Sequence, residues 1–232
     1  FNRRIVMRDG TVKTHGRFSD PGALCYEGPV DPEVAVIAAR APGGELLGAL
    51  VNFACHPAHH GGDTVFSAGW PGKLADELKA RGCPSTLFIN GAQGNISTTD
   101  PARGGSDQGM EQIGKILAED VAEILAKLAW RKRLSIAARA CKVELPFRKP
   151  GEDEIRGTLR GAQRFVDPSL YDKHMPEVLK KMKERGCQAA EVQTLILDEY
   201  ACVGMPCELF VELGLRLKER AHPRRALVFG LA

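Results

Sequence analysis

The sequence predicts an α/β fold in which one mixed β-sheet is flanked by helices on both faces, an α/β/α sandwich. Apolar strand-like segments alternate with helical patterns along the chain. The clearest helical pattern covers residues 108–129, where apolar residues recur at the spacing of a single helix face. Three of the strand-like segments end at glycine, proline or histidine, which is typical of strands that deliver side chains to the edge of a sheet.

The other predicted elements, in chain order, are strands at 33–40 and 46–55, a helix at 71–81, strands at 85–90 and 134–147, a charged helical region at 152–185, a strand at 192–204, a helix at 208–221 and a strand at 225–231. The first two strands form a hairpin, because the proline and two glycines at 42–44 favour a tight turn. Residues 173–185 are dense in charge, which indicates a solvent-exposed face. There is no internal repeat or low-complexity linker, so we expect a single domain over 1–232.

The composition is typical of a globular enzyme. The 232 residues are 44% hydrophobic and 26% charged, with a formal net charge of +3. Because that charge is spread over many residues of both signs, nucleic acid is not an expected partner. No apolar run reaches the ~20 residues that a membrane-spanning helix needs, so no transmembrane segment is expected. The seven cysteines are irregularly spaced and look reduced rather than paired in disulfides.

A histidine ends the most apolar strand of the chain. Residues 50–55 are almost wholly apolar, and His56 follows them directly. Pro57 has no backbone N–H and cannot continue a central ladder, so the strand is expected to stop there. The imidazole would then lie at the edge of the sheet, where open α/β sheets bind their ligands. The alternative is a hydrogen-bonded core histidine.

Two other strands end in the same way. The strand at 85–90 leads into a glycine-rich loop that ends at Ser97, a candidate nucleophile, oxyanion donor or helix cap. The strand at 192–204 leads to Glu208, a carboxylate that the dipole of the following helix also favours. Beside it, Cys207 is a weaker candidate nucleophile, because a helix N-terminus lowers the pKa of a thiol.

An imidazole, a carboxylate and a hydroxyl at three strand ends suit a catalytic zinc site. Such a site has about three protein ligands and leaves one position for water, whose pKa falls to roughly 7. His59, His60 and Asp63 follow His56 closely and either add ligands or form a hydrophilic loop. The chain has no His-Glu-x-x-His or Cys-x-x-Cys pattern that would define the site on its own.

Six segments together resemble the catalytic domain of the neutral/alkaline non-lysosomal ceramidases and their bacterial relatives. In chain order, these segments are Asn2-Arg3-Arg4, Gly28 to Glu33, Asn52 to Pro57, Phe66 to Gly72, Asn90 to Ser97 and Gly204 to Phe210. Their order and spacing agree with the family throughout.

The resemblance implies a zinc-dependent amide hydrolase of sphingolipid metabolism, whose partner is a ceramide-like N-acyl lipid or another amide. It implies that His56 and Glu208 bind Zn²⁺. It also implies that Ser97 lies beside the reacting carbonyl and that Arg3 faces the substrate. Without the resemblance, Arg3 is a surface charge near the start of the chain. The family implies a secreted or periplasmic location, whereas the reduced-looking cysteines leave a cytoplasmic one open.

Three positions depart from the family pattern. Asn95 and Gly69 stand where many relatives have aspartate, and Cys207 stands in place of a glycine. Carboxylates behind metal ligands orient the ligating histidines, and losing one commonly costs about 10- to 100-fold in affinity or rate. A weakened or re-tuned site is therefore expected.

The family's remaining zinc ligands have no counterpart in this sequence. One is a histidine of a Thr-His-Thr-His segment upstream of the Asn-Arg motif, and the other is a tyrosine after the last strand. We therefore expect 1–232 to be the C-terminal part of a catalytic domain, which needs the absent N-terminal part and the residues after 232 to complete the site. Two alternatives remain: a metallohydrolase of small amides or peptides on the same scaffold, and a non-catalytic binding relative with a decayed site.

Overall fold

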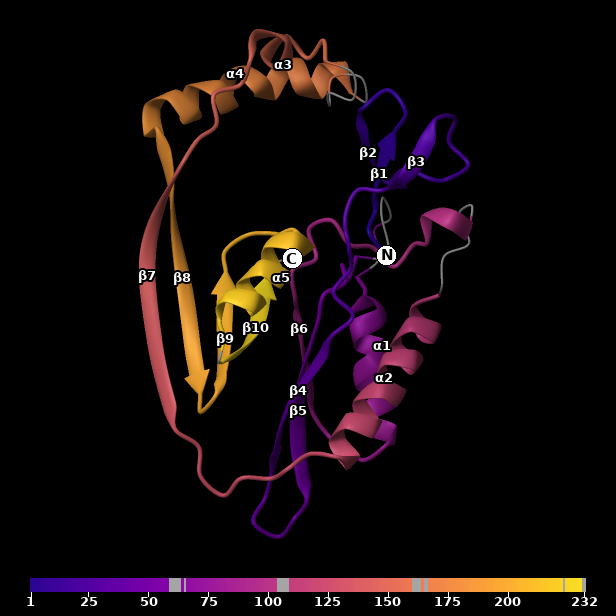
Figure 1. Cartoon of the computed structure of the whole chain (residues 1–232), viewed down its shortest axis with the longest axis vertical. Coiled ribbons are helices and arrows are strands. Elements are labelled where there is room, and N and C mark those ends of the chain that lie inside the picture. The colour runs from indigo at the N-terminus through magenta and orange to yellow at the C-terminus, as the bar shows by residue number, and fades with distance from the viewer. Residues whose placement is uncertain are drawn as a thin grey trace. The chain divides into compact units, whose positions relative to one another are not determined.

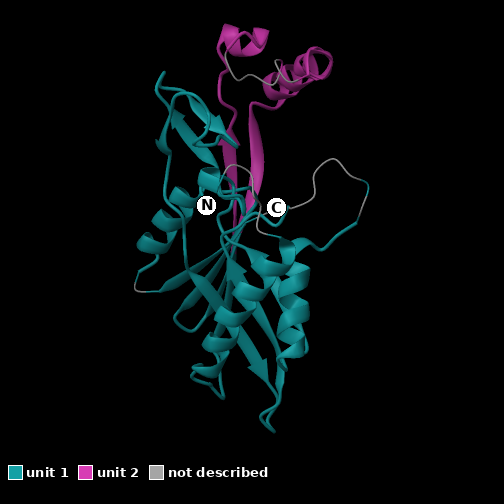
Figure 2. Ribbon diagram, turned by 90° about the vertical axis from the view of Figure 1, so that its right-hand side faces the viewer, with its two compact units in different colours: residues 1–139, 193–232 teal, residues 140–192 magenta. Residues whose placement is uncertain are grey.

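The computed structural model describes residues 1–58, 64, 66–103, 109–159, 164, 167–222 and 224–230. The chain divides into two compact units, Phe1–Arg139 with Gln193–Ala232, and Ala140–Val192 (Figure 2). The described helices are α1 (Gly69–Ala80), α2 (Met110–Ala126), α3 (Glu152–Arg156), α4 (Pro168–Arg185) and α5 (Val211–Arg220). The described strands are β1 (Arg4–Met7), β2 (Val12–Thr14), β3 (Ala23–Tyr26), β4 (Val34–Arg40), β5 (Leu46–Phe53), β6 (Thr86–Asn90), β7 (Ile136–Pro146), β8 (Cys187–Leu197), β9 (Tyr200–Met205) and β10 (Arg225–Gly230).

The α/β class predicted from the sequence is confirmed, but the strands of the described residues form three sheets instead of one. Their orders are β2-β1-β3, β4-β5-β6 and β10-β9-β8-β7. The first sheet was not predicted. Its strands are short and β2 is exposed along its whole length, so it has no apolar face for a sequence pattern to reveal. An isolated bridge between Asn2 and Ile96 ties this region to the loop after β6.

The central sheet confirms the predicted hairpin. Strand β4 pairs with β5 in antiparallel orientation, and β5 pairs with β6 in parallel orientation. In Figure 1, α1 and α2 lie on one side of these strands and α5 lies against β10 on the other side. The largest buried cluster gathers residues from the strands and from α1 and α2, including Ala49, Val51, Trp70, Leu74, Leu78, Leu117, Ala118 and Val121. Each fully buried aliphatic side chain of this kind stabilises the fold by about 1.5–3 kcal/mol.

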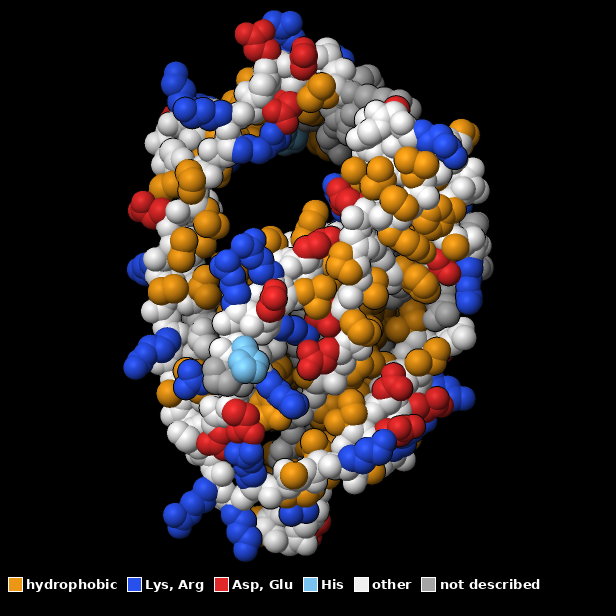
Figure 3. All heavy atoms as spheres, in the orientation of Figure 1, with side chains coloured by type: hydrophobic (Ala, Val, Ile, Leu, Met, Phe, Trp, Pro, Cys, Tyr) orange, Lys and Arg blue, Asp and Glu red, His pale blue; other side chains and the backbone are white. Residues whose placement is uncertain are grey.

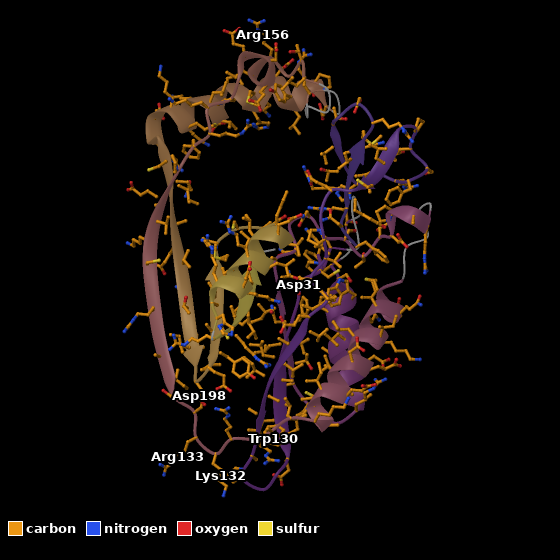
Figure 4. All side chains as sticks on the ribbon, in the orientation of Figure 1. Asp31, Trp130, Lys132, Arg133, Arg156 and Asp198 are labelled. Atoms are coloured by element: carbon orange, nitrogen blue, oxygen red, sulfur yellow. The ribbon has the colours of Figure 1, made fainter. Side chains whose placement is uncertain are left out.

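Residues 192–204 do not form the single strand that the sequence predicted. They form the end of β8, a tight turn, and β9, which pairs antiparallel with β8. The turn contains no glycine or proline, and Asp198 takes the left-handed backbone conformation there with φ +52°. Arg131 donates to Asp198 at 2.9 Å and to Glu199 at 2.6 Å (Asp198 is labelled in Figure 4). The turn is thus stabilised by a distant residue that no local pattern reveals.

One buried amide connects the central sheet to β10. Asn52 of β5 donates from Nδ2 to the carbonyl oxygens of Ile89 (2.9 Å) and Val228 (3.0 Å). Both acceptors are main-chain carbonyl groups, so the Asn52 side chain links β6 to β10 through two hydrogen bonds. The connection places the ends of β5, β6 and β10 near one another, which matters for the site described below.

The second unit contains the helical region predicted at 152–185, observed as the separate helices α3 and α4. The side chain of Asp167 accepts a hydrogen bond from the backbone N–H of Leu170 (3.0 Å) and so caps α4. Tyr171, the buried residue of α4, donates to the carbonyl oxygens of Glu154 and Ile155 in α3. That contact joins the two helices.

None of the described helices is both long enough and apolar enough to cross a membrane. Basic and acidic side chains are interspersed over the face drawn in Figure 3.

Candidate functional site

Two of the predicted site residues meet at the ends of their strands. His56 follows β5 and Glu208 follows β9, and the His56 Nε2 atom lies 3.9 Å from the Glu208 Oε2 atom. The loop after β6 passes close to Glu208, because a Cβ at Gly94 would lie 2.3 Å from the Glu208 carbonyl oxygen. Only glycine allows this approach. Gly94 therefore lets the loop after β6 pack directly against the main chain of Glu208.

Arg3 is held at the same place and is not a frayed surface charge. Its backbone N–H donates to the Asn95 carbonyl (2.8 Å), and its Nη2 donates to the Gly94 carbonyl (2.7 Å). Its Nε atom is buried and has no hydrogen-bond partner among the described residues. An orphaned buried donor is costly, about 1–3 kcal/mol. The Arg3 Nε–H is therefore an unsatisfied donor among the described residues.

His15 also lies at this site, although no sequence pattern predicts it there. Its Nε2 is 3.3 Å from Arg3 Nη1, and its backbone N–H donates to the Arg3 carbonyl (2.8 Å). The only local signal is the Gly16 that follows it, which indicates a turn but not its partner. Sequence reasoning missed this residue because the contact depends on the pairing of β1 with β2, two strands that no pattern predicted.

Trp70 anchors the main chain of His56. Its indole Nε1 donates to the His56 carbonyl oxygen at 3.1 Å, and the ring is fully buried. It packs edge-to-face on Phe53 and Phe88, with ring centroids 6.5 and 4.6 Å away. Trp70, which belongs to the Phe66–Gly72 segment, thus restrains the main chain of the candidate ligand His56.

Both imidazoles at the site are biased toward their neutral form. Desolvation lowers the pKa of His56 and the Arg3 charge lowers it further, while Glu208 opposes both. Desolvation, Arg3 and His56 lower the pKa of His15. Because each folded-state pKa lies below the ordinary 6.5, the unfolded chain binds more protons below that pH. The stability contributed by the neutral imidazoles is present above pH 6.5 and is lost as the pH falls.

Replacing Arg3 with alanine is expected to raise the pKa of both His15 and His56, because it removes a positive charge that disfavours both imidazolium ions. A ¹H NMR titration of the imidazole protons, assigned with single histidine variants, would measure this. Arg3→Lys keeps the charge and should retain most of the lowering. Arg4→Ala is the matched control, since Arg4 pairs with Glu27 instead. Unchanged titrations in Arg3→Ala would contradict the electrostatic account.

The His56–Glu208 pair fits two ligands of one zinc ion. Two ligands at about 2.0–2.1 Å from a tetrahedral zinc lie roughly 3.3 Å apart, close to the observed 3.9 Å. One contact must change, because His56 Nδ1 accepts a hydrogen bond from the Ala58 N–H (3.2 Å). Zinc binding through Nε2 requires the proton on Nδ1, so the Ala58 N–H has to turn away.

Further metal ligands are not provided by the part of the chain that the structure describes. No group of three or more His, Cys, Asp or Glu side chains there is arranged to hold a metal. His59, His60 and Asp63, named from the sequence as either further ligands or a hydrophilic loop, lie outside the described residues.

Ser97 lies at an apolar cavity beside the strand end. Its Oγ accepts a hydrogen bond from the Thr99 N–H at 3.2 Å, a turn contact of the kind expected if it acts as a cap. The same residue lines a cavity of ≈ 390 Å³. Other residues of the lining are Phe1, Val30, Phe53, Cys55, Ile96 and Ile113. Ser97 therefore faces a largely hydrophobic space next to the residue that precedes His56.

The departures at Asn95 and Gly69 have local structural causes. Asn95 is fully buried, accepts from the Val211 N–H (2.8 Å) and donates to both oxygens of Glu212 (2.9 and 3.2 Å). An aspartate at position 95 would place a second negative charge beside the Glu212 carboxylate. Gly69 has φ +59°, and a Cβ there would lie 2.9 Å from the Pro57 carbonyl oxygen. An aspartate does not fit this backbone without strain.

The predicted start of the last helix was wrong. The sequence placed Glu208 and Cys207 in or beside its first turn, whereas α5 begins at Val211 with Phe210 as its N-cap. The pKa of Cys207 is raised by desolvation and not lowered by a helix terminus. The helix begins at Val211 because Asn95, from the loop after β6, accepts a hydrogen bond from the Val211 N–H. Cys207 therefore lacks the adjacent helix N-terminus on which its candidacy as a nucleophile depended.

No family model matches the chain, and no curated protein matches it. Among solved structures, the neutral ceramidase from Pseudomonas aeruginosa superposes with a TM-score of 0.57 over 91% of this chain, at 18% sequence identity. The chain has a ceramidase-like fold. A second structure, described as ceramidase complexed with C2, gives a TM-score of 0.54 at 18% identity, again over 91% of this chain. The chain spans 41–42% of the length of the two structures.

Proposed function

We propose that this chain is part of a zinc-dependent amide hydrolase that cleaves N-acyl amides of the ceramide type. The observation that carries the proposal is the convergence of His56, Glu208 and Arg3 at one edge of a ceramidase-like fold. At 18% identity the likeness is one of fold, so the chemistry is argued from the residues themselves.

His56 and Glu208 are the residues that would hold the zinc ion, with further ligands from outside the described residues. When bound, zinc supplies a Lewis acid for the substrate carbonyl and lowers the pKa of a water molecule. The lowered pKa of His56 keeps its imidazole neutral, as a metal ligand must be. Trp70 restrains the His56 main chain, although the imidazole must still release its contact with the Ala58 N–H before it can bind zinc.

Arg3 is the proposed donor to the oxygen of the reacting carbonyl. Its buried Nε–H has no partner among the described residues, and its Nη2 is already fixed to Gly94. A donor of this kind gains most when negative charge develops on the oxygen, and removing one in comparable sites costs roughly 3–4 kcal/mol of transition-state stabilisation. Ser97 would position the acyl side of the substrate.

The apolar cavity beside Ser97 supports an N-acyl lipid in preference to a small soluble amide. Most of its lining side chains are aliphatic or aromatic, with Asp31 and Asp120 as the charged exceptions, and its volume of ≈ 390 Å³ is within the range of small-molecule sites. An acyl chain in this cavity would lie beside Ser97 and beside Cys55, the residue that precedes His56.

Elemental analysis of the full-length protein tests the metal site. We expect about one zinc per chain, lost in both His56→Ala and Glu208→Ala and kept in His174→Ala, whose histidine is exposed on α4. Hydrolysis of N-dodecanoylsphingosine should disappear in the first two variants only. Zinc that is absent from the wild type, or that is unaffected by both substitutions, would refute the proposal.

A further inference from the structure

We propose that His15 is a positioning residue of this site, which holds the Arg3 guanidinium in the orientation that a substrate oxygen requires. The identity of that oxygen rests on the proposed function above. The contact between His15 and Arg3 does not.

The backbone holds His15 in an uncommon conformation. Its φ is +57°, one of two positive values among the non-glycine residues that the structure describes. This left-handed conformation costs a residue with a side chain roughly 1–2 kcal/mol. Two neighbours maintain it: the His15 N–H donates to the Arg3 carbonyl (2.8 Å), and Gly16 packs so closely that a Cβ would lie 3.0 Å from Ile5. One of the two contacts that hold this backbone is therefore made to Arg3 itself.

The side chain of His15 provides the second of two contacts to the terminal nitrogens of the Arg3 guanidinium. Arg3 Nη2 donates to the Gly94 carbonyl at 2.7 Å, and Arg3 Nη1 lies 3.3 Å from His15 Nε2. Because arginine has no acceptor, Nε2 must be the acceptor and the neutral ring carries its proton on Nδ1. The guanidinium is planar, so contacts at both terminal nitrogens fix the direction of the third N–H group.

That third group is the Nε–H, which is buried and has no partner among the described residues. Without His15, the guanidinium would be held at Nη2 alone and could rotate about that contact. The Nε–H would then no longer be fixed in one direction. This is why His15 is expected to act through Arg3 and not on the substrate.

NMR of the arginine side chains tests the contact without reference to activity. In wild-type full-length protein, the two Nη groups of Arg3 should give separate resonances, because rotation of the guanidinium is restricted. In His15→Ala they should merge. His15→Gln should keep them separate, since glutamine Oε1 reaches the position of the histidine Nε2 and can accept from Nη1. Separate resonances in His15→Ala would overturn the proposal, as would merged resonances in the control His174→Ala.

Kinetics test the consequence. With N-dodecanoylsphingosine, kcat/KM is expected to fall about 10-fold in His15→Ala, the equivalent of one hydrogen bond. It should recover in His15→Gln. A wild-type rate with merged resonances in His15→Ala would overturn the positioning role. If the wild type hydrolyses no N-acyl amide, the proposed function fails, and the NMR result alone decides whether His15 holds Arg3.

Discussion

Replacing Asn95 with aspartate is expected to lower the free energy of unfolding by about 3 kcal/mol, although the two side chains have nearly the same shape. Asn95 is fully buried between the loop after β6 and the start of α5. Its Nδ2 donates to both carboxylate oxygens of Glu212, at 2.9 and 3.2 Å. Aspartate offers no donor there and places a second negative charge against the first. Urea denaturation of the full-length protein at neutral pH would measure the loss.

The double variant Asn95→Asp/Glu212→Gln separates charge repulsion from packing. Glutamine can donate to the new carboxylate, so most of the lost stability should return and the two substitutions should be strongly coupled. The deficit of the single variant should also shrink as the pH is lowered, because protonation of one carboxyl group removes the repulsion. A single variant as stable as the wild type, or a double variant with no recovery, would show that the Asn95–Glu212 contact is not important for stability.

Replacing Lys218 with methionine is expected to destabilise the protein by about 3 kcal/mol, because it leaves a buried carboxylate without its partner. Lys218 Nζ lies 2.6 Å from Asp31 Oδ2 and 2.7 Å from Glu33 Oε2, and the Asp31 side chain is only 6% exposed. Asp31, labelled in Figure 4, belongs to the segment Gly28–Glu33, so this contact fastens that segment to α5.

The matched control is Lys127→Met. Lys127 pairs with Glu123 at 3.4 Å, but both side chains are more than 70% exposed, so the expected change is below about 0.5 kcal/mol. Equal effects of the two substitutions would contradict the argument from burial.

The Lys218 cluster also predicts a stability change at alkaline pH. Burial lowers the pKa of Lys218, and the hydrogen bonds and charges of Asp31 and Glu33 raise it by more, so the net pKa lies above the ordinary 10.5. The stabilisation is therefore complete below pH 10.5 and is lost as the pH rises through the higher folded-state value. The free energy of unfolding of the wild type should fall as the pH rises above 10.5. The part of that fall that comes from Lys218 should be absent in Lys218→Met.

Much of the fold could be predicted because its elements carry local patterns. The hairpin of β4 and β5, the helix α2 and the strand β6 all follow from apolar periodicity and turn residues, and their observed bounds differ from the prediction by a few residues. The errors occurred where such patterns are absent. Strands β1 to β3 have no continuous apolar face, and the turn at Asp198 depends on Arg131, a residue far away in the sequence.

The candidate site was predictable only in part, for the same reason. His56 and Glu208 each follow a recognisable apolar strand, and the structure brings them within 3.9 Å of each other. His15 and Trp70 have no such signal. Their roles depend on a strand pair and on an aromatic contact that exist only once the chain has folded.

The sequence by itself determined the α/β class, most of its strands and helices, and the chemical types of group at the strand ends, because these depend on periodicity and on the residues that interrupt it. The tertiary structure alone decided which of these groups meet. It placed Arg3 against Gly94 and His15, turned Asn95 toward Glu212, and required glycine at position 69. Those outcomes depend on distances between segments far apart in the chain, and a one-dimensional pattern contains no information about such distances.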